Sequence, residues 1–265
     1  MKNAAALLEE YSMKRIISFF LCVLMTAALL AGCGDRKQRT TWIIAVDGDF
    51  SPFVCADANG KAGGLDVELL DAIARDQNFR YELRPSDWDT AMSVFTSHQA
   101  QVLMGSIASS QERIDGGWFF SHSFYNGVTQ SMAMEPSSDT NTLEDLAGKA
   151  VAVVSGTLGA AYAESVKDKY GFSIATFSDS HSMYAAVLEG RAAACFEDTP
   201  ALRDSIAGGV ALELVPGSEG AASDYCVAIC DEKDRPFLEL FNQGLANIRA
   251  NGIYDAILAK YADTL

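Results

Sequence analysis

Short β-rich runs alternate with helical patterns from about residue 41 onward, and this alternation restricts the chain to α/β folds. In the first set, β-rich residues 42–46, 81–83 and 102–104 are separated by helical patterns at 66–77 and 89–97. Leu65, Leu69, Leu70 and Ile73 recur at helical spacing, which predicts an amphipathic helix that faces a core. We therefore expect βαβ units on a mainly parallel sheet.

A second set of the same kind follows the polar residues 135–141. Thr142 to Asp145 resemble a capping box, with Asp145 in place of the usual Glu or Gln, and predict the start of a short helix. The predicted strands are 151–154, 174–177, 193–196 and 225–229, and the predicted helices are 160–169, 183–189, 199–206, 236–250 and 254–261. We expect two lobes, each a mainly parallel sheet flanked by helices: residues 41–131 with 226–265, and residues 132–225. Two strands, near 127–134 and 225–229, would cross between the lobes.

The N-terminus has the features of a secretory signal. Lys14 and Arg15 precede an apolar run at residues 16–30, which leads into Ala31, Gly32 and Cys33. A membrane-spanning helix is the alternative, but it needs about 20 apolar residues and this run is shorter. Because the run ends in a sequence that resembles a lipobox, we predict a signal peptide over residues 1–32, with Met13 as an alternative start. Cys33 would carry the lipid, palmitate included, and residues 33–40 would tether the protein to the extracytoplasmic face of the cell membrane.

Charge and residue chemistry argue against several classes of function. The formal net charge is −15, so we expect no nucleic-acid partner. His98, His122 and His181 are scattered, and no His, Cys or Asp group has the spacing of metal ligands or of a nucleophile with its base. We therefore expect no metal, no cofactor and no enzymatic activity.

Four cysteines follow Cys33 in the chain: Cys55, Cys195, Cys226 and Cys230. Cys226 and Cys230 fall on one face of a predicted strand, about 13 Å apart at the rise of a strand. That separation is too large for a disulfide between them. We expect mostly buried free thiols, with a disulfide of Cys195 as the alternative.

The order of short motifs along the chain resembles one family. The motifs include Asp47 to Phe53, Gly64 to Val67, Trp88-Asp89, Gly105 to Ala108, Glu112-Arg113, Ser155 to Thr157, Asp198 to Pro200 and Asn251-Gly252. Together they resemble the polar amino-acid binding proteins of ABC importers, which are the extracellular solute-binding proteins of family 3. The resemblance spans about residues 42–261, and the chain departs from the family's usual Trp at Tyr261. It implies the type II, Venus flytrap fold, a free amino acid as ligand, a membrane permease as partner and a monomeric protein.

The resemblance also implies roles for particular residues. Arg113 would bind the ligand's carboxylate through its planar guanidinium, and Asp198 would bind the ammonium. Backbone N–H groups of Gly105, Ser106, Ala108, Thr157 and Leu158 would share the carboxylate. Phe50 and Trp88 would sandwich the ligand, and Asp47 would lie near its side chain, which hints at a cationic or polar amino acid. Ala108, Leu158 and Phe50 replace residues that often carry a hydroxyl in the family, so the hydrogen bonds made at these positions would differ.

Each role has a structural alternative. Arg113 would otherwise be a surface arginine, and Asp198 the N-cap of a helix that begins with Thr199-Pro200. Phe50 and Trp88 would otherwise be core residues. Two other functions use the same fold: a dehydratase or lyase on prephenate-like acids, and a ligand-sensing receptor module. Glu197 could serve as an acid in such an enzyme, but neighbouring residues on a strand face opposite ways, so we expect Glu197 to face away from Asp198. We favour a freestanding binding protein, because no signalling domain follows the predicted body.

Overall fold

The computed structural model describes residues 41–265. The predicted signal peptide over residues 1–32, the lipidated Cys33 and the tether over residues 33–40 lie outside these residues.

The first sheet combines parallel and antiparallel strands. Its order is β5 (Arg80–Ser86), β1 (Thr41–Asp47), β6 (Val102–Ala108), β14 (Ser223–Ile229) and β7 (Phe119–Phe120), with β8 (Tyr125–Val128) also on β14. Strand β1 runs parallel to both β5 and β6. Strand β14 is antiparallel to β6, because the chain returns here from the second sheet. The strands β1, β5 and β6 confirm the βαβ units that the sequence predicts.

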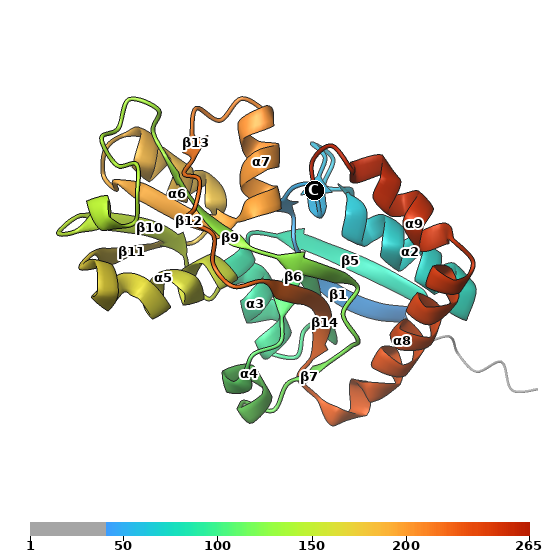
Figure 1. The fold of residues 1–265 in the computed structure, drawn as a ribbon. Coiled ribbons are helices and arrows are strands. Elements are labelled where there is room, and N and C mark those ends of the chain that lie inside the picture. Colours follow the sequence, from blue (N-terminus) through green and yellow to red (C-terminus); the bar gives the residue numbers. More distant parts are fainter. Residues whose placement is uncertain (1–40) are drawn as a thin grey trace, which may run out of the picture. The chain divides into compact units, whose positions relative to one another are not determined.

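The second sheet repeats this plan. Its order is β11 (Ser173–Phe177), β10 (Ala150–Val154), β12 (Ala194–Asp198), β9 (Gln130–Met134) and β13 (Glu213–Leu214). Strand β10 is parallel to β11 and β12, whereas β9 is antiparallel to β12. The connecting strands therefore add antiparallel pairings to the parallel half of each sheet, and β9 and β14 carry the chain between the sheets (Figure 1).

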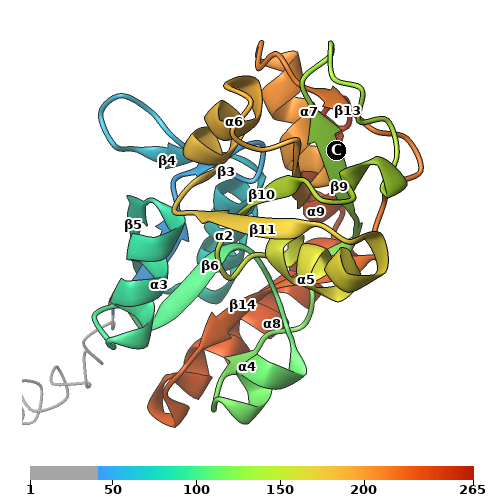
Figure 2. The same ribbon diagram turned by 90° about the vertical axis from the view of Figure 1, so that its left-hand side faces the viewer.

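Helices flank both sheets. They are α2 (Leu65–Gln77), α3 (Trp88–Thr96), α4 (Gln111–Asp115), η1 (Glu144–Leu146), α5 (Leu158–Tyr170), α6 (Ser180–Leu188), α7 (Thr199–Ala207), η2 (Glu232–Asp234), α8 (Arg235–Ala250), α9 (Ile253–Leu258) and η3 (Ala259–Tyr261). Figure 2 shows α5 and α6 on opposite faces of the second sheet. We call the elements β1 to β8 with β14, α2 to α4, α8 and α9 the first lobe, and β9 to β13 with α5 to α7 the second lobe. This arrangement confirms the predicted two-lobed α/β class.

A small three-stranded flap precedes α2 in the first lobe. It consists of β2 (Asp49–Phe50), β3 (Val54–Ala56) and β4 (Ala62–Gly63). Gly64 follows the flap as the N-cap of α2, with φ +106°. A Cβ atom at Gly64 would lie 2.4 Å from the carbonyl oxygen of Phe53, so only glycine fits both the backbone angle and the space. This glycine holds the flap against the start of α2.

The apolar core continues from one lobe to the other. One buried cluster combines Trp88 and Leu103 of the first lobe with Val154 and Met183 of the second. Leu158, at the start of α5, packs against the buried residues of the first lobe. The two lobes are therefore in apolar contact as well as joined by β9 and β14.

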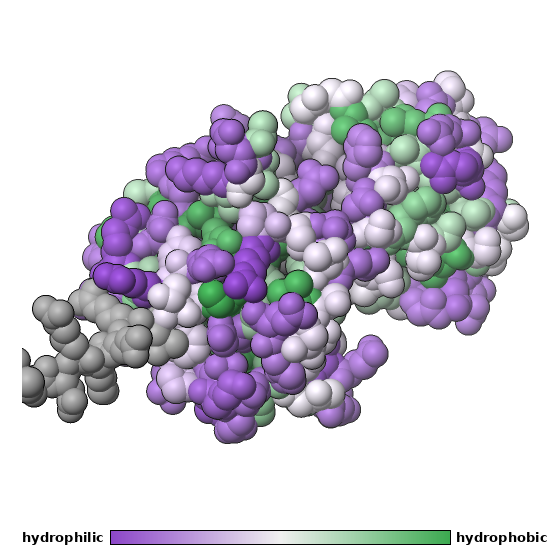
Figure 3. All heavy atoms as spheres, turned by 180° about the vertical axis from the view of Figure 1, so that it is seen from behind, coloured by the Kyte–Doolittle hydropathy of each residue, from purple (hydrophilic) through white to green (hydrophobic). Residues whose placement is uncertain are grey.

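The surface of residues 41–265 is mainly polar. On the face shown in Figure 3, apolar residues form separate patches between polar ones. Among the described residues the exposed large apolar side chains are Ile114, Leu188 and Ile253, which lie on three different elements. No helix within residues 41–265 is long and apolar enough to cross a bilayer.

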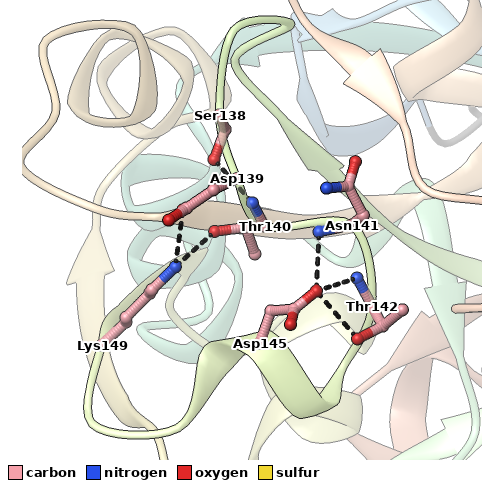
Figure 4. Close-up of polar contacts among 7 residues, drawn as sticks. All are labelled: Ser138, Asp139, Thr140, Asn141, Thr142, Asp145 and Lys149. Atoms are coloured by element: carbon pink, nitrogen blue, oxygen red, sulfur yellow. Dashed lines mark hydrogen bonds and ion pairs between the residues drawn. The ribbon is translucent and has the colours of Figure 1, made fainter.

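The loop before β10 contains the expected acidic half of a capping box (Figure 4). Asp145 Oδ2 accepts hydrogen bonds from the backbone N–H of Asn141 and of Thr142, each at 2.9 Å. The hydroxyl of Thr142 also donates to Asp145 Oδ2, but it does not cap the helix as predicted, because Leu143 is the N-cap and no side chain caps η1. The element that follows is the single 3₁₀ turn η1. Lys149 fixes the other side of the loop through Asp139 and Thr140 (Figure 4).

The four cysteines of the described body are free thiols, as expected. Cys195 and Cys226 are buried, Cys230 is half-buried and Cys55 is exposed on the flap. The alternative, a disulfide of Cys195, is not formed.

Candidate ligand-binding site

A cavity lies between the lobes at the carboxyl ends of the parallel strands, which is where α/β sheets usually bind ligands. Residues of both lobes line it: Asp47, Phe50, Trp88, Gly105, Ile107, Arg113, Val154, Thr157, Leu158, Ser180, Glu197 and Asp198. Eight of the ten predicted ligand-binding residues are among them. The other two, Ser106 and Ala108, belong to β6.

Arg113 reaches the cavity from α4 and is held at both lobes. Its Nη1 donates to the carbonyl oxygen of Ala108 at 2.7 Å, and its Nη2 donates to the carbonyl oxygen of Gly156 at 2.9 Å. The guanidinium carbon lies 5.5 Å from the ring centroid of Trp118. Burial lowers the pKa of Arg113, but a guanidinium keeps its charge in proteins. Arg113 thus places a fixed positive charge at the cavity wall and is not a surface arginine.

Asp198 is the last residue of β12 and is fully enclosed. It occupies the N-cap position of α7, as the alternative interpretation expects, but its side chain makes no capping hydrogen bond. Instead Gln130 Nε2 donates to Asp198 Oδ1 at 3.0 Å, and the hydroxyl of Tyr225 donates to Oδ2. Burial raises the pKa of Asp198, although both hydrogen bonds act in the opposite direction. Since Gln130 and Tyr225 belong to β9 and β14, the carboxylate is positioned by both strands that join the lobes.

Two aromatic rings form the apolar part of the wall. Phe50 ends β2, and its ring stacks on Phe53 with the centroids 5.8 Å apart. Trp88 begins α3, and its Nε1 donates to the carbonyl oxygen of Ser155 in the second lobe at 2.9 Å. Both side chains are buried, so each belongs to the core and to the cavity wall at once.

The N-terminus of α5 faces the same cavity. Thr157 is its N-cap: the hydroxyl accepts from the N–H of Ala160 at 3.2 Å and donates to the carbonyl of Val154 at 2.8 Å. Leu158 is the first helical residue and Gly159 the second. The first N–H groups of a helix lack partners within it and favour anions. The second lobe therefore offers a favourable environment for a carboxylate.

Two further carboxyl groups line the cavity. Asp47, at the end of β1, accepts from the N–H of Asp49 at 3.1 Å, and burial raises its pKa to about 7. Glu197 is buried on β12, where Oε2 accepts from the hydroxyl of Ser180 at 2.8 Å and Oε1 from the N–H of Asp198 at 3.0 Å. Burial and the neighbouring Asp198 raise the pKa of Glu197.

The expectation that Glu197 faces away from Asp198 is wrong. Asp198 is the last residue of its strand, with φ −62° and ψ 129°, and the chain turns into α7 immediately after it. Strand alternation holds only inside a strand, so both side chains reach one cavity. Ile107, Val154 and Ser180 were also not predicted. Ile107 lies within one recognised motif and Val154 directly precedes another, whereas nothing in the sequence around Ser180 marks it as a site residue.

The residues of this cavity can bind a small zwitterion. The guanidinium and the helix N-terminus attract a carboxylate, Asp198 attracts an ammonium, and the aromatic rings contact the carbon skeleton. Within residues 41–265 no group of three or more His, Cys, Asp and Glu side chains is placed to hold a metal ion. Two lobes with such a cavity between them define a solute-binding protein of the two-lobed type.

The chain belongs to the bacterial extracellular solute-binding proteins, family 3, whose family model matches residues 42–264. It is similar to the lysine/arginine/ornithine-binding periplasmic protein of Escherichia coli (strain K12), with 25% identity over 83% of this chain and 86% of that protein. The L-cystine-binding protein TcyJ of the same strain is 24% identical over 89% of this chain and 92% of its own length. Among solved structures, a mutant of ArgBP from T. maritima matches with 26% identity and a TM-score of 0.74, covering 86% of this chain and 97% of that one.

Proposed function

We propose that this protein binds a free polar or charged amino acid between its lobes and is the extracytoplasmic substrate-binding component of an ABC importer. One observation carries the proposal: Arg113 and Asp198 bring opposite charges to a single cavity, one from each lobe. An α-amino acid has the matching pair of charges on one carbon. The relatives named above, which bind amino acids, support the same function.

Arg113 binds the carboxylate and Asp198 the ammonium in this proposal. To reach a carboxylate, the guanidinium exchanges its hydrogen bonds to the carbonyl groups of Ala108 and Gly156 for two to the ligand. The N–H groups at the start of α5 and along Gly105 to Ala108 complete the carboxylate site. Phe50 and Trp88 enclose the ligand's carbon atoms.

The two lobes close on the ligand. In this proposal residues 41–131 with 226–265 form the lobe that holds Arg113, and residues 132–225 form the lobe that holds Asp198. Neither lobe holds both charges, so only the closed arrangement contacts the carboxylate and the ammonium of one ligand at the same time. A ligand shifts such an equilibrium by its difference in affinity for the two states.

An enzymatic function and a sensory function have less support than the binding of an amino acid for transport. Among the described residues, those that line the cavity include hydroxyl and carboxyl groups but no histidine, lysine or cysteine that could activate a nucleophile. The relatives named above are binding proteins.

Calorimetry on unfolded, dialysed and refolded protein tests this function. We expect saturable binding of at least one common amino acid, and a loss of about tenfold or more in affinity when Arg113 is replaced with lysine. Lysine keeps the charge but loses the planar pair of donors. Arg84→Lys, on the exposed side of β5, is the matched control and should bind normally. No binding of any amino acid would refute the function, and unchanged binding by Arg113→Lys would refute the role of Arg113.

We also propose that Cys33 carries a lipid that anchors the protein to the extracytoplasmic face of the cell membrane. The apolar run that leads into Cys33 supports this. Cys33→Ser should yield soluble protein or an unprocessed precursor, and fractionation with a labelled fatty acid would measure both. Incorporation of the label into Cys33→Ser would contradict the assignment.

A further inference from the structure

The cavity contains more carboxyl groups than a simple zwitterion needs. Arg113 matches the ligand's carboxylate, and Asp198 matches its ammonium, if the proposed function is correct. Asp47 and Glu197 remain, one from each lobe. Among residues 41–265, neither forms an ion pair with a lysine or arginine, and the donors of Arg113 point to carbonyl oxygens.

Glu197 is held in a fixed position. The residue is 2% exposed, and each of its carboxyl oxygens accepts one hydrogen bond, from Ser180 and from the N–H of Asp198. A carboxyl group that is buried without a counter-charge is costly unless a cation reaches it. A ligand with a positive side chain is the group that would neutralise Glu197 and Asp47 from inside the cavity.

A second cavity adjoins the first and gives a long side chain room. Its volume is about 130 Å³, and it shares Phe50 and Ser180 with the main cavity. Asp49 and His181 lie in its wall. Ser180, which lines both cavities, donates its hydroxyl to Glu197, so Glu197 lies at the boundary between them.

We propose that Glu197 is a specificity-determining residue which, together with Asp47, selects an amino acid with a positively charged side chain. The titratable groups around Glu197 are Asp198 and Cys195 on its own strand, Tyr184 on α6 and Asp47 on β1, with Arg113 across the cavity. Three crowded carboxyl groups facing one arginine retain protons that a cation displaces.

The direction of the pH dependence follows from this proton release. Burial raises the pKa of Asp47 to about 7, and burial with Asp198 also raises that of Glu197. A bound cation favours the ionised carboxylates and lowers both pKa values, so the complex holds fewer protons than the free protein. Affinity for a cationic ligand therefore rises as the pH rises through about 7. Asp198 meets the ammonium of either kind of ligand, so Asp47 and Glu197 act on the ratio of the two affinities: the affinity for a cationic ligand rises relative to that for a neutral ligand of the same shape.

The test compares arginine and lysine with citrulline, which replaces the guanidinium of arginine with a neutral urea group. By calorimetry at pH 8, we expect the wild-type protein to prefer arginine or lysine over citrulline by at least about tenfold, and the preference to shrink at pH 5.5. Runs in two buffers of different ionisation enthalpy should show net proton release for the cation. Glu197→Gln should lower the preference about tenfold and remove part of the proton release, while Glu213→Gln, an exposed substitution in the same lobe, should change neither.

Each result decides between the proposals. Wild-type protein that binds citrulline or glutamine more tightly than both cations at pH 8 overturns the role of Glu197 and leaves the proposed function intact. Protein that binds no amino acid refutes the proposed function itself. If Glu197→Gln fails to fold, Asp47→Asn replaces it, because Asp47 is the partly exposed member of the pair. An unchanged cation preference in that variant also overturns the proposal.

Discussion

Asp198→Asn should lower the affinity for the bound amino acid by about 100-fold or more, the largest loss expected of any single change of charge in this cavity. The substitution keeps the shape of the side chain but removes the negative charge that meets the ammonium. A hydrogen bond to a charged group contributes about 1.5–3 kcal/mol, and the ammonium can make more than one. Gln130 and Tyr225 can reorient toward an asparagine, because an amide and a hydroxyl each donate and accept. The fold should therefore survive, and calorimetry would measure the loss.

The same variant tests closure of the lobes. Asp168→Asn, exposed on α5, is the matched control and should bind like the wild type. In small-angle scattering, saturating ligand should reduce the radius of gyration of the wild-type protein, and it should do so less for Asp198→Asn at the same concentration. The forward scattering should correspond to a monomer. A radius of gyration that the ligand leaves unchanged or increases would contradict closure of the two lobes.

The long periodic elements could be predicted from the sequence, and the short ones could not. Apolar residues recur at helical spacing over residues 236–250, and this run is long enough to locate α8, whose observed bounds are Arg235–Ala250. The flap strand β2 consists only of Asp49–Phe50, and β4 only of Ala62–Gly63, so neither is long enough to show the alternation of apolar and polar residues that marks a strand. Both pair with β3 in short antiparallel hairpins, Asp49 with Cys55 and Cys55 with Gly63, and two-residue strands are too short to reveal such pairing in the sequence.

The candidate site was likewise predicted only in part from the sequence. Arg113 and Asp198 were predicted from the order of motifs, although each alone also fits a surface arginine or a helix cap. Glu197 was missed because strand alternation was extended one residue too far. Ser180 reaches the cavity from the start of α6 and contacts Glu197 at a sequence separation of 17 residues. Only the fold brings these two residues together.

Gly159→Ala should destabilise the protein and weaken ligand binding, although alanine favours helices over glycine by about 1 kcal/mol. Gly159 is the second residue of α5, and an added Cβ would lie 2.5 Å from the carbonyl oxygen of Phe196 and 3.2 Å from the Cα of Glu197. Both atoms belong to the backbone of β12, so the strand cannot yield as a side chain would. The start of α5 must move away and take Thr157 and Leu158 with it. We expect a loss of about 1–3 kcal/mol in the free energy of unfolding and about tenfold or more in affinity.

Urea unfolding and calorimetry measure these two losses separately. Gly63→Ala is the matched control, because its nearest neighbour beyond the adjacent residues would be 3.9 Å away and its φ is outside the left-handed region. That change should alter stability by less than about 0.5 kcal/mol and leave binding unchanged. Because α5 begins at the cavity and packs on the strand that carries both Glu197 and Asp198, a shift of this helix alters the carboxylate site and the acidic wall together. A Gly159→Ala protein that is more stable than the wild type and binds equally well would show that close packing of α5 on β12 does not position the site.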